Sequence, residues 1–168
     1  MAVVNVKSAA ITNRDATPAV LNSPHSTFGF LQESVGYVAV TSGDSIASIY
    51  RMCQVPTNAR IASLKLSCTA ITTCAADIGA YRVTSADGTA GAVVDVDFFA
   101  TAQSLASVLI NSDVINESTT NTPEKQAQPL WQALGEASDP GGFYDLAITL
   151  TAAAGSGGSM TLKATFVD

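Results

Sequence analysis

The chain has 168 residues, 47% of them hydrophobic and 13% charged, a composition that excludes disorder over most of its length. Fourteen acidic and eight basic residues give a formal net charge of −6, and the sequence has none of the clusters of Lys or Arg that bind nucleic acids or anionic membranes. No apolar run approaches the roughly 18 uncharged residues of a membrane-spanning helix. We therefore expect a weakly charged, folded protein that binds neither nucleic acid nor membrane.

Residues 1–36 show no periodic apolar pattern. Asn, Asp and Pro residues interrupt the segment, and each Pro disfavours helix at the residue before it. Isolated apolar side chains remain at four positions: Val20, Leu21, Phe28 and Phe30. We predict an extended arm over residues 1–36 that carries these side chains as anchors, with a loop-rich segment packed on its own domain as the alternative.

From Tyr37 onward the sequence has the pattern of short β-strands. Apolar alternation, β-branched residues and turn residues predict strands at residues 37–41, 46–55, 61–69 and 76–84. In the third strand, Leu64, Leu66 and Cys68 face the same side. The fourth leaves two choices of buried face, which are Ile78 with Ala80 or Tyr81 with Val83. Asp87-Gly88 is a hairpin turn signal.

The middle of the chain has a different pattern. Phe98, Ala102, Leu105 and Leu109 recur at helical spacing, which predicts a helix with Asp97 as its N-cap. A second short helix is expected over residues 128–134, with Pro129 near its start and Gly135 at its end. The polar residues 116–126 between the two helices lack periodicity and predict a surface loop.

The last part of the chain alternates most clearly. Apolar residues occupy every second position in two runs: Tyr144, Leu146, Ile148 and Leu150, then Met160, Leu162, Ala164 and Phe166. A linker of small residues, 153–158, joins the runs, so we predict an antiparallel hairpin with one buried face. Together the patterns predict an all-β protein: an antiparallel β-sandwich over residues 37–168, with one or two short helical insertions and the N-terminal arm.

The sequence has little material for catalysis. His25, beside Pro24, is the single histidine, and no nucleophile elbow accompanies it. We therefore expect no enzyme, no catalytic residue and no cofactor. Three cysteines are an odd number and few for a disulfide scaffold, so we expect reduced, buried thiols at Cys53, Cys68 and Cys74. The first residues lack the pattern of a signal peptide, which predicts synthesis in the cytoplasm.

Two weaker binding signals remain. Asp87, Asp95 and Asp97 could offer oxygen ligands to an ion, but they lack the spacing of an EF-hand loop. Simpler roles explain the three residues: Asp87 forms a turn, Asp95 is solvated and Asp97 caps a helix. We therefore expect no metal. Five aromatic residues are candidates for stacking on a sugar: Tyr37, Tyr50, Tyr81, Trp131 and Tyr144. Trp131 lies between Leu130 and Leu134, so we expect it to be buried against the sandwich.

Several stretches, taken together, resemble a family of small structural proteins of tailed-bacteriophage heads. The stretches are AITNRDATP (10–18) with VLN (20–22), VPTNARI (55–61), ADIGAY (76–81), VDVDFFA (94–100) and PLWQALG (129–135). The resemblance covers most of the chain, and each stretch alone is of low specificity. It implies the jelly-roll form of the sandwich and a role as a capsid decoration or cement protein, and it carries no catalytic motif.

The resemblance also implies partners and a location. These are the major capsid protein, further copies of this chain as a dimer or trimer, and the capsid surface of a virion assembled in a bacterial host. On this interpretation the arm contacts the shell through five residues: Pro18, Val20, Leu21, Phe28 and Phe30. The alternatives are another virion part, such as a fibre or connector accessory, or a carbohydrate-binding jelly roll. The sequence leaves open the host, the capsid geometry and the shell contacts.

Overall fold

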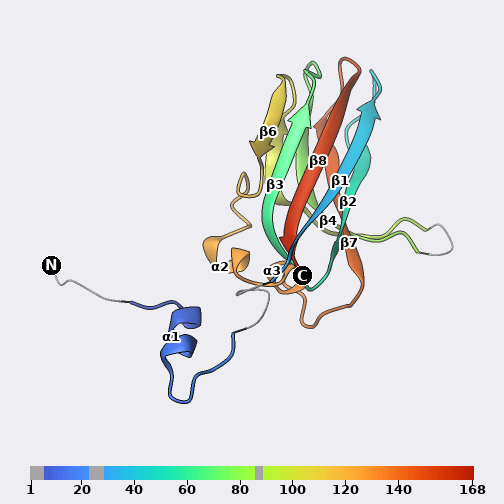
Figure 1. The fold of residues 1–168 in the computed structure, drawn as a ribbon. Coiled ribbons are helices and arrows are strands. Elements are labelled where there is room, and N and C mark those ends of the chain that lie inside the picture. The colour runs from blue at the N-terminus through green and yellow to red at the C-terminus, as the bar shows by residue number, and fades with distance from the viewer. Residues whose placement is uncertain (1–5, 23–28, 86–88) are drawn as a thin grey trace.

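The protein is a sandwich of two four-stranded antiparallel sheets (Figure 1). The computed structural model describes residues 6–22, 29–85 and 89–168. Its strands are β1 (Leu31–Val40), β2 (Ile49–Pro56), β3 (Arg60–Cys68), β4 (Ala75–Arg82), β5 (Val93–Ser104), β6 (Leu109–Asp113), β7 (Phe143–Ala152) and β8 (Gly158–Val167). The predicted all-β sandwich is confirmed.

The order of the strands is that of a jelly roll. One sheet runs β1-β8-β3-β6 and the other β2-β7-β4-β5. The first strand therefore pairs with the last, the second with the seventh, the third with the sixth and the fourth with the fifth. This pairing arises when one long hairpin rolls into two facing sheets, which is the architecture of jelly-roll domains. The jelly-roll form that the resemblance implied is confirmed.

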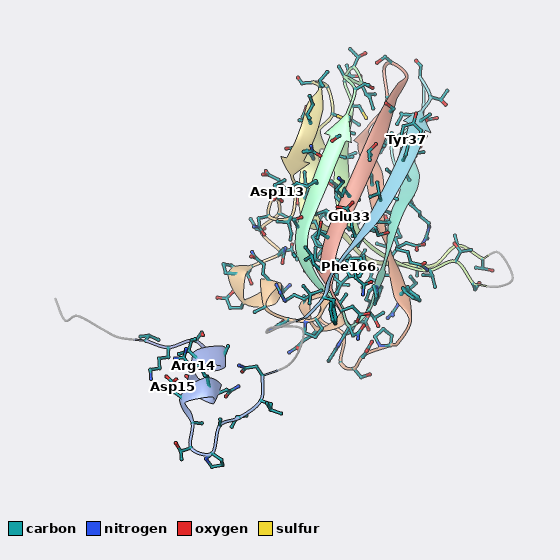
Figure 2. The ribbon with its side chains drawn as sticks, viewed as in Figure 1. Arg14, Asp15, Glu33, Tyr37, Asp113 and Phe166 are labelled. Carbon is teal, nitrogen blue, oxygen red and sulfur yellow. The ribbon has the colours of Figure 1, made fainter. Side chains whose placement is uncertain are left out.

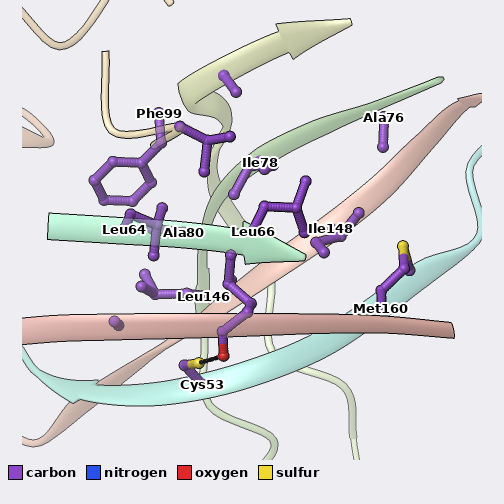
Figure 3. Packing of buried hydrophobic residues seen from close by; sticks show 14 of the residues in the cluster. Cys53, Leu64, Leu66, Ala76, Ile78, Ala80, Phe99, Leu146, Ile148 and Met160 are labelled. Carbon is purple, nitrogen blue, oxygen red and sulfur yellow. Dashed lines mark hydrogen bonds between the residues drawn. The ribbon is translucent and has the colours of Figure 1, made fainter. Parts of the chain in front are cut away.

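The core lies between the two sheets, where the predicted inward faces meet (Figure 3). Leu64 and Leu66 on β3 and Leu146 and Ile148 on β7 are fully buried, as their alternation predicts. The three cysteines are free and buried, and burial raises the pKa of each thiol. The Cys53 thiol donates a hydrogen bond to the Leu162 carbonyl oxygen at 3.1 Å, so it adds a bond between the sheets to its apolar packing.

The predicted hairpin at the end of the chain is wrong. Strands β7 and β8 lie in different sheets, and the small-residue linker between them crosses from one sheet to the other. Alternation shows that each strand buries one face, but two strands that bury facing sides need not be hydrogen-bonded to each other. The linker enters the core at Ala154, and the Ala154 amide donates to the Asp44 carbonyl oxygen at 3.0 Å.

The helix predicted from Phe98 is also wrong, since this region forms β5 and β6. Between the pairs Ala80–Asp95 and Ile78–Ala100, β5 carries four residues where β4 carries Gly79 alone. This wide bulge buries both Phe98 and Phe99, and Ala102 then has a positive φ of 50° while its amide donates to Asp77. The bulge and the positive φ of Ala102 interrupt the alternation of buried and exposed residues along the strand. The apolar residues that remain are spaced about as in a helix, which explains the wrong prediction. Asp97 is consequently not a helix cap.

Two short helices close one end of the sandwich. Helix α3 (Leu130–Ala133) matches the predicted second helix in part, with Pro129 as its N-cap and Gly135 at φ +84° just beyond it. Its Leu130 is buried in the core. Helix α2 (Pro123–Gln126) lies inside the predicted surface loop, which is a correction. This single turn places the Lys125 ammonium 5.3 Å from the centre of the Phe98 ring. Because the two residues are far apart in the sequence, no periodic pattern predicts this contact. Among the described residues, no helix is both long and apolar enough to span a membrane.

The connection between β4 and β5 leaves the side of the sandwich as a hairpin (Figure 1). Arg51 on β2 holds its base, because the guanidinium donates to the carbonyl oxygens of Arg82 and Gly91, each at 2.7 Å. The same group donates to the Asp145 carboxylate at 2.8 Å and lies 5.3 Å from the centre of the Tyr81 ring. The half-buried Arg51 guanidinium thus donates a hydrogen bond to a backbone carbonyl oxygen at each end of the hairpin. Asp87-Gly88, the predicted turn, lies outside the described residues.

Candidate binding surface

The N-terminal segment 6–22 is folded by polar interactions, which corrects the expectation of an extended arm. It contains helix α1 (Ala9–Asp15), whose N-cap Ser8 accepts a hydrogen bond from the Ile11 amide. Asn22 folds the chain back, donating to the Ala10 carbonyl oxygen and accepting from Asn13. Side-chain bonds of this kind leave no trace in apolar periodicity, so the sequence pattern did not reveal the helix.

Electrostatic contacts reinforce this folded segment. The Lys7 ammonium and the Arg14 guanidinium each lie 2.8 Å from an Asp15 carboxylate oxygen (Figure 2). Hydrogen bonds from Arg14 and Lys7 hold the pKa of Asp15 below its ordinary value. The carboxylate is therefore ionised at neutral pH and ties the start of the segment to the end of α1.

The segment leaves its apolar side chains uncovered. Leu21 is 96% exposed, and Pro18 and Val20 are exposed beside it. No residue of α1 is buried, and Figure 1 shows the helix standing apart from the sandwich. Of the other predicted anchors, Phe30 is exposed directly before β1, and Phe28 lies outside the described residues. The role of all five residues as shell contacts stays a prediction, and the structure shows that Pro18, Val20, Leu21 and Phe30 are exposed.

Strand β1 continues this exposed apolar surface, and our sequence analysis missed most of it. The strand begins at Leu31, ahead of the predicted domain start at Tyr37, so the end of the predicted arm belongs to the sandwich. Leu31, Val35 and Tyr37 point outward, while the small residues Ser34 and Gly36 point inward. At the other end of the strand, Val38 and Val40 face the core.

Gly36 explains why the inward side is small. A Cβ atom there would collide with the backbone of Met52 on β2, because the edges of the two sheets approach each other at this point. The Cys53 thiol also lies 3.3 Å from the Ser34 carbonyl oxygen. The outward residues Leu31, Val35 and Tyr37, which we call the β1 stripe, therefore contribute little to the core of their own chain.

The β1 stripe lies at the edge of the outer face of its sheet (Figure 2). Ion pairs join neighbouring strands of this face, with the Lys65 ammonium 2.7 Å from the Asp113 carboxylate and the Lys163 ammonium 3.8 Å from the Glu33 carboxylate. The other outward positions of β3 and β8 include four hydroxyl side chains: Ser63, Ser67, Thr161 and Thr165. The basic groups are neutralised within the chain, so the face can be covered without stripping isolated charges of water.

Two of the three aspartates considered as ion ligands, Asp95 and Asp97, lie close together on β5. Asp95 Oδ1 accepts a hydrogen bond from the Asp97 amide at 3.3 Å, and the described residues contain no group of three or more His, Cys, Asp or Glu side chains able to hold a metal. Asp87, the third candidate, lies outside the described residues. The pKa of Asp95 is raised, mainly because the carboxyl is partly buried and secondly because Asp97 is its neighbour. The positive charge of Lys125 opposes this shift but does not cancel it.

We expect Asp95→Asn to raise the melting temperature at pH 7 by a few degrees. The pKa of Asp95 is higher in the folded than in the unfolded chain, so ionisation favours unfolding and stability falls as the pH rises through the folded pKa. The Asn side chain removes this cost and its oxygen can still accept from the Asp97 amide. Melting curves at pH 7 and pH 3 provide the measurement. The two proteins should converge at pH 3, where Asp95 is protonated in both states, and a gain of equal size at both pH values would contradict the electrostatic cause.

The predicted aromatic candidates for sugar stacking are mostly engaged inside the protein. Tyr81 and Tyr144 are buried, and Trp131 packs against the core as expected. The half-buried Tyr50 donates a hydrogen bond to Asp44 at 2.6 Å. Tyr37 is the one of the five that stands exposed, at 70%. His25 lies outside the described residues. A stacking platform of several aromatic side chains is therefore not formed by these five residues.

Comparisons with known proteins give one likeness in structure. No family model matches the sequence, and no curated protein matches it. A chain of the "Cyanophage Pam1 capsid asymmetric unit" matches in structure, with a TM-score of 0.50 and 14% sequence identity, over 91% of this chain and 96% of that chain. At this identity the likeness shows a shared fold. It extends over nearly the full length of both chains, so the common part is the whole jelly roll.

Proposed function

We propose that this protein is a non-enzymatic structural component of a phage virion that binds the outer surface of the capsid and stabilises it, as a decoration or cement protein. The observation that supports this most is the fold shared almost end to end with a chain of a phage capsid asymmetric unit. The head-protein resemblance of the sequence points in the same direction. The major capsid protein is the proposed partner, and the capsid surface is the proposed location.

The N-terminal segment supports a role in attachment. Its fold depends on hydrogen bonds and ion pairs, while Val20 and Leu21 are left in water. Burial of such side chains in a partner contributes roughly 1.5–3 kcal/mol each. An element that is folded and displays apolar side chains loses less conformational entropy on binding than a disordered one. We infer that this segment docks into the shell.

Deletion of residues 1–22 tests this role. The deletion ends before β1, so the sandwich should retain its melting temperature. We expect the full chain to cosediment with heads that lack it and the truncated chain to remain in the supernatant. A paired substitution, Val20→Asp with Leu21→Asp, should weaken binding at least tenfold, whereas Val93→Asp on β5 should not. Equal cosedimentation of the truncated chain would contradict the proposal.

Copy number separates decoration from the other virion roles. Quantitative mass spectrometry of purified virions should find this chain at a level comparable to that of the major capsid protein. A level typical of tail or vertex components would favour a fibre or connector accessory instead. Absence of the chain from virions would overturn the structural role.

A further inference from the structure

We propose that the outer face of the β1-β8-β3-β6 sheet binds the same face of a second copy of this chain, about a two-fold axis that runs across the strands. This inference concerns a surface other than the N-terminal segment and does not rest on capsid binding. Figure 1 shows the four strands of this face side by side, with neither α2 nor α3 lying across them.

The first support is the apolar outer side of β1. Val38 and Val40 face the core, as the apolar residues of a half-buried strand normally do. Val35 and Tyr37, in contrast, are 54% and 70% exposed, and the inward positions on either side of Val35 hold Ser34 and Gly36. The core of this chain does not cover the β1 stripe. A contiguous exposed apolar surface bordered by polar residues is the mark of a protein contact.

The second support is that most side chains at the centre of the face are short. Ser63, Ser67, Thr161 and Thr165 occupy outward positions of the two central strands, and the longer Lys65 and Lys163 lie between them. Short hydroxyl side chains let a second sheet approach to the packing distance of about 10 Å. With strands about 4.8 Å apart and a rise of about 3.3 Å per residue, the 34 residues of the four strands give an area of roughly 540 Å², before side-chain relief is added. Stable interfaces bury about 800 Å² per partner, so the face supplies a large part of that area.

The third support is the placement of charge, which identifies the occupant and the axis. The strand register puts Glu33 in one row with Thr165, and Val35 in the next row with Lys163 and Lys65. A two-fold axis between these rows sets each Glu33 opposite Val35 of the other copy, and the Lys163 of that copy is the neighbour of Val35 on the adjacent strand. It sets each lysine opposite a hydroxyl residue. The same operation places Leu31 of one copy opposite Tyr37 of the other.

An axis parallel to the strands would not work. It would place Lys163 of one copy against Lys65 of the other and gather four ammonium groups at the centre of the contact. Like charges brought together in this way oppose association. The charge pattern thus favours one isologous arrangement, in which both copies use the same surface.

Sedimentation equilibrium of the purified full chain tests the proposal. We expect the mass of two chains at micromolar concentration. Val35→Lys should raise the dissociation constant of the dimer at least tenfold. Val93→Lys is the matched control, because Val93 is also 54% exposed and lies on an edge strand of the other sheet. A native chain that stays monomeric, or equal weakening by both substitutions, would overturn the proposal.

Charge exchange tests the axis independently. Glu33→Lys and Lys163→Glu should each weaken the dimer, since residues 33 and 163 of the two copies are neighbours across the contact and would then carry like charges at both symmetric positions. An equimolar mixture of the two variants should form a heterodimer, in which both contacts again join opposite charges. Mixing cannot change contacts within a chain. Absence of the heterodimer, with both variants folded, would show that these two residues do not meet across the contact.

Discussion

Replacing Gly36 with Ala is expected to lower the free energy of unfolding by about 3 kcal/mol, the upper end of the range for inserting one carbon into a packed site. The Cβ atom would collide with the backbone of Met52. Unlike a side chain, this backbone cannot move away by adopting another rotamer. Strands β1 and β2 would have to separate, and the edge of the sandwich that they close would open. Urea unfolding followed by circular dichroism measures the loss.

Gly43→Ala is the control for this prediction. Gly43 has a φ of +93° and open space around the missing Cβ, so Ala there strains the backbone without a collision. That strain costs about 1–2 kcal/mol. If Gly36→Ala destabilised the protein less than Gly43→Ala, the close approach of the two sheet edges would not be the reason for glycine at position 36.

Phe98→Ala is expected to lower the free energy of unfolding by about 3–5 kcal/mol, as for other fully buried aromatic residues. Phe98 is 1% exposed, and its ring meets the Phe99 ring edge to face at a centroid distance of 4.9 Å. Lys125 covers its other side and joins α2 to the bulge of β5. The substitution removes the side chain that connects the bulge to the helical end of the sandwich.

Phe143→Ala gives the matched comparison, since Phe143 also lies on a strand but is 48% exposed. Its loss should be below about 1 kcal/mol, because part of its surface is already in water. Denaturant unfolding of both variants makes the test. Similar losses at the two positions would mean that the bulge of β5 is not packed as described.

The candidate binding surface was predicted in part. Val20, Leu21 and Phe30 were singled out because apolar residues without a periodic partner must find cover outside a regular core, and the structure displays all three. The β1 stripe was missed because Leu31 and Val35 lie within residues 1–36, where the sequence showed no periodic apolar pattern. Which face of a strand is buried depends on what lies behind it, and here the Met52 backbone leaves room for no side chain.

The sequence by itself determined the strand-rich fold, most strand positions and the inward faces of β3, β7 and β8. Those features follow from local alternation, which needs no knowledge of distant residues. The separate sheets of β7 and β8, and the strands β5 and β6 in place of a helix from Phe98, were settled by the tertiary structure alone. The same holds for the exposure of Leu31, Val35 and Tyr37 on β1. Each depends on contacts between residues far apart in the chain: pairing partners, a bulge opposite Gly79 and the approach of two sheet edges at Gly36. The periodicity of one segment does not depend on such contacts, so it cannot predict them. They are determined only by the tertiary structure of the whole sandwich.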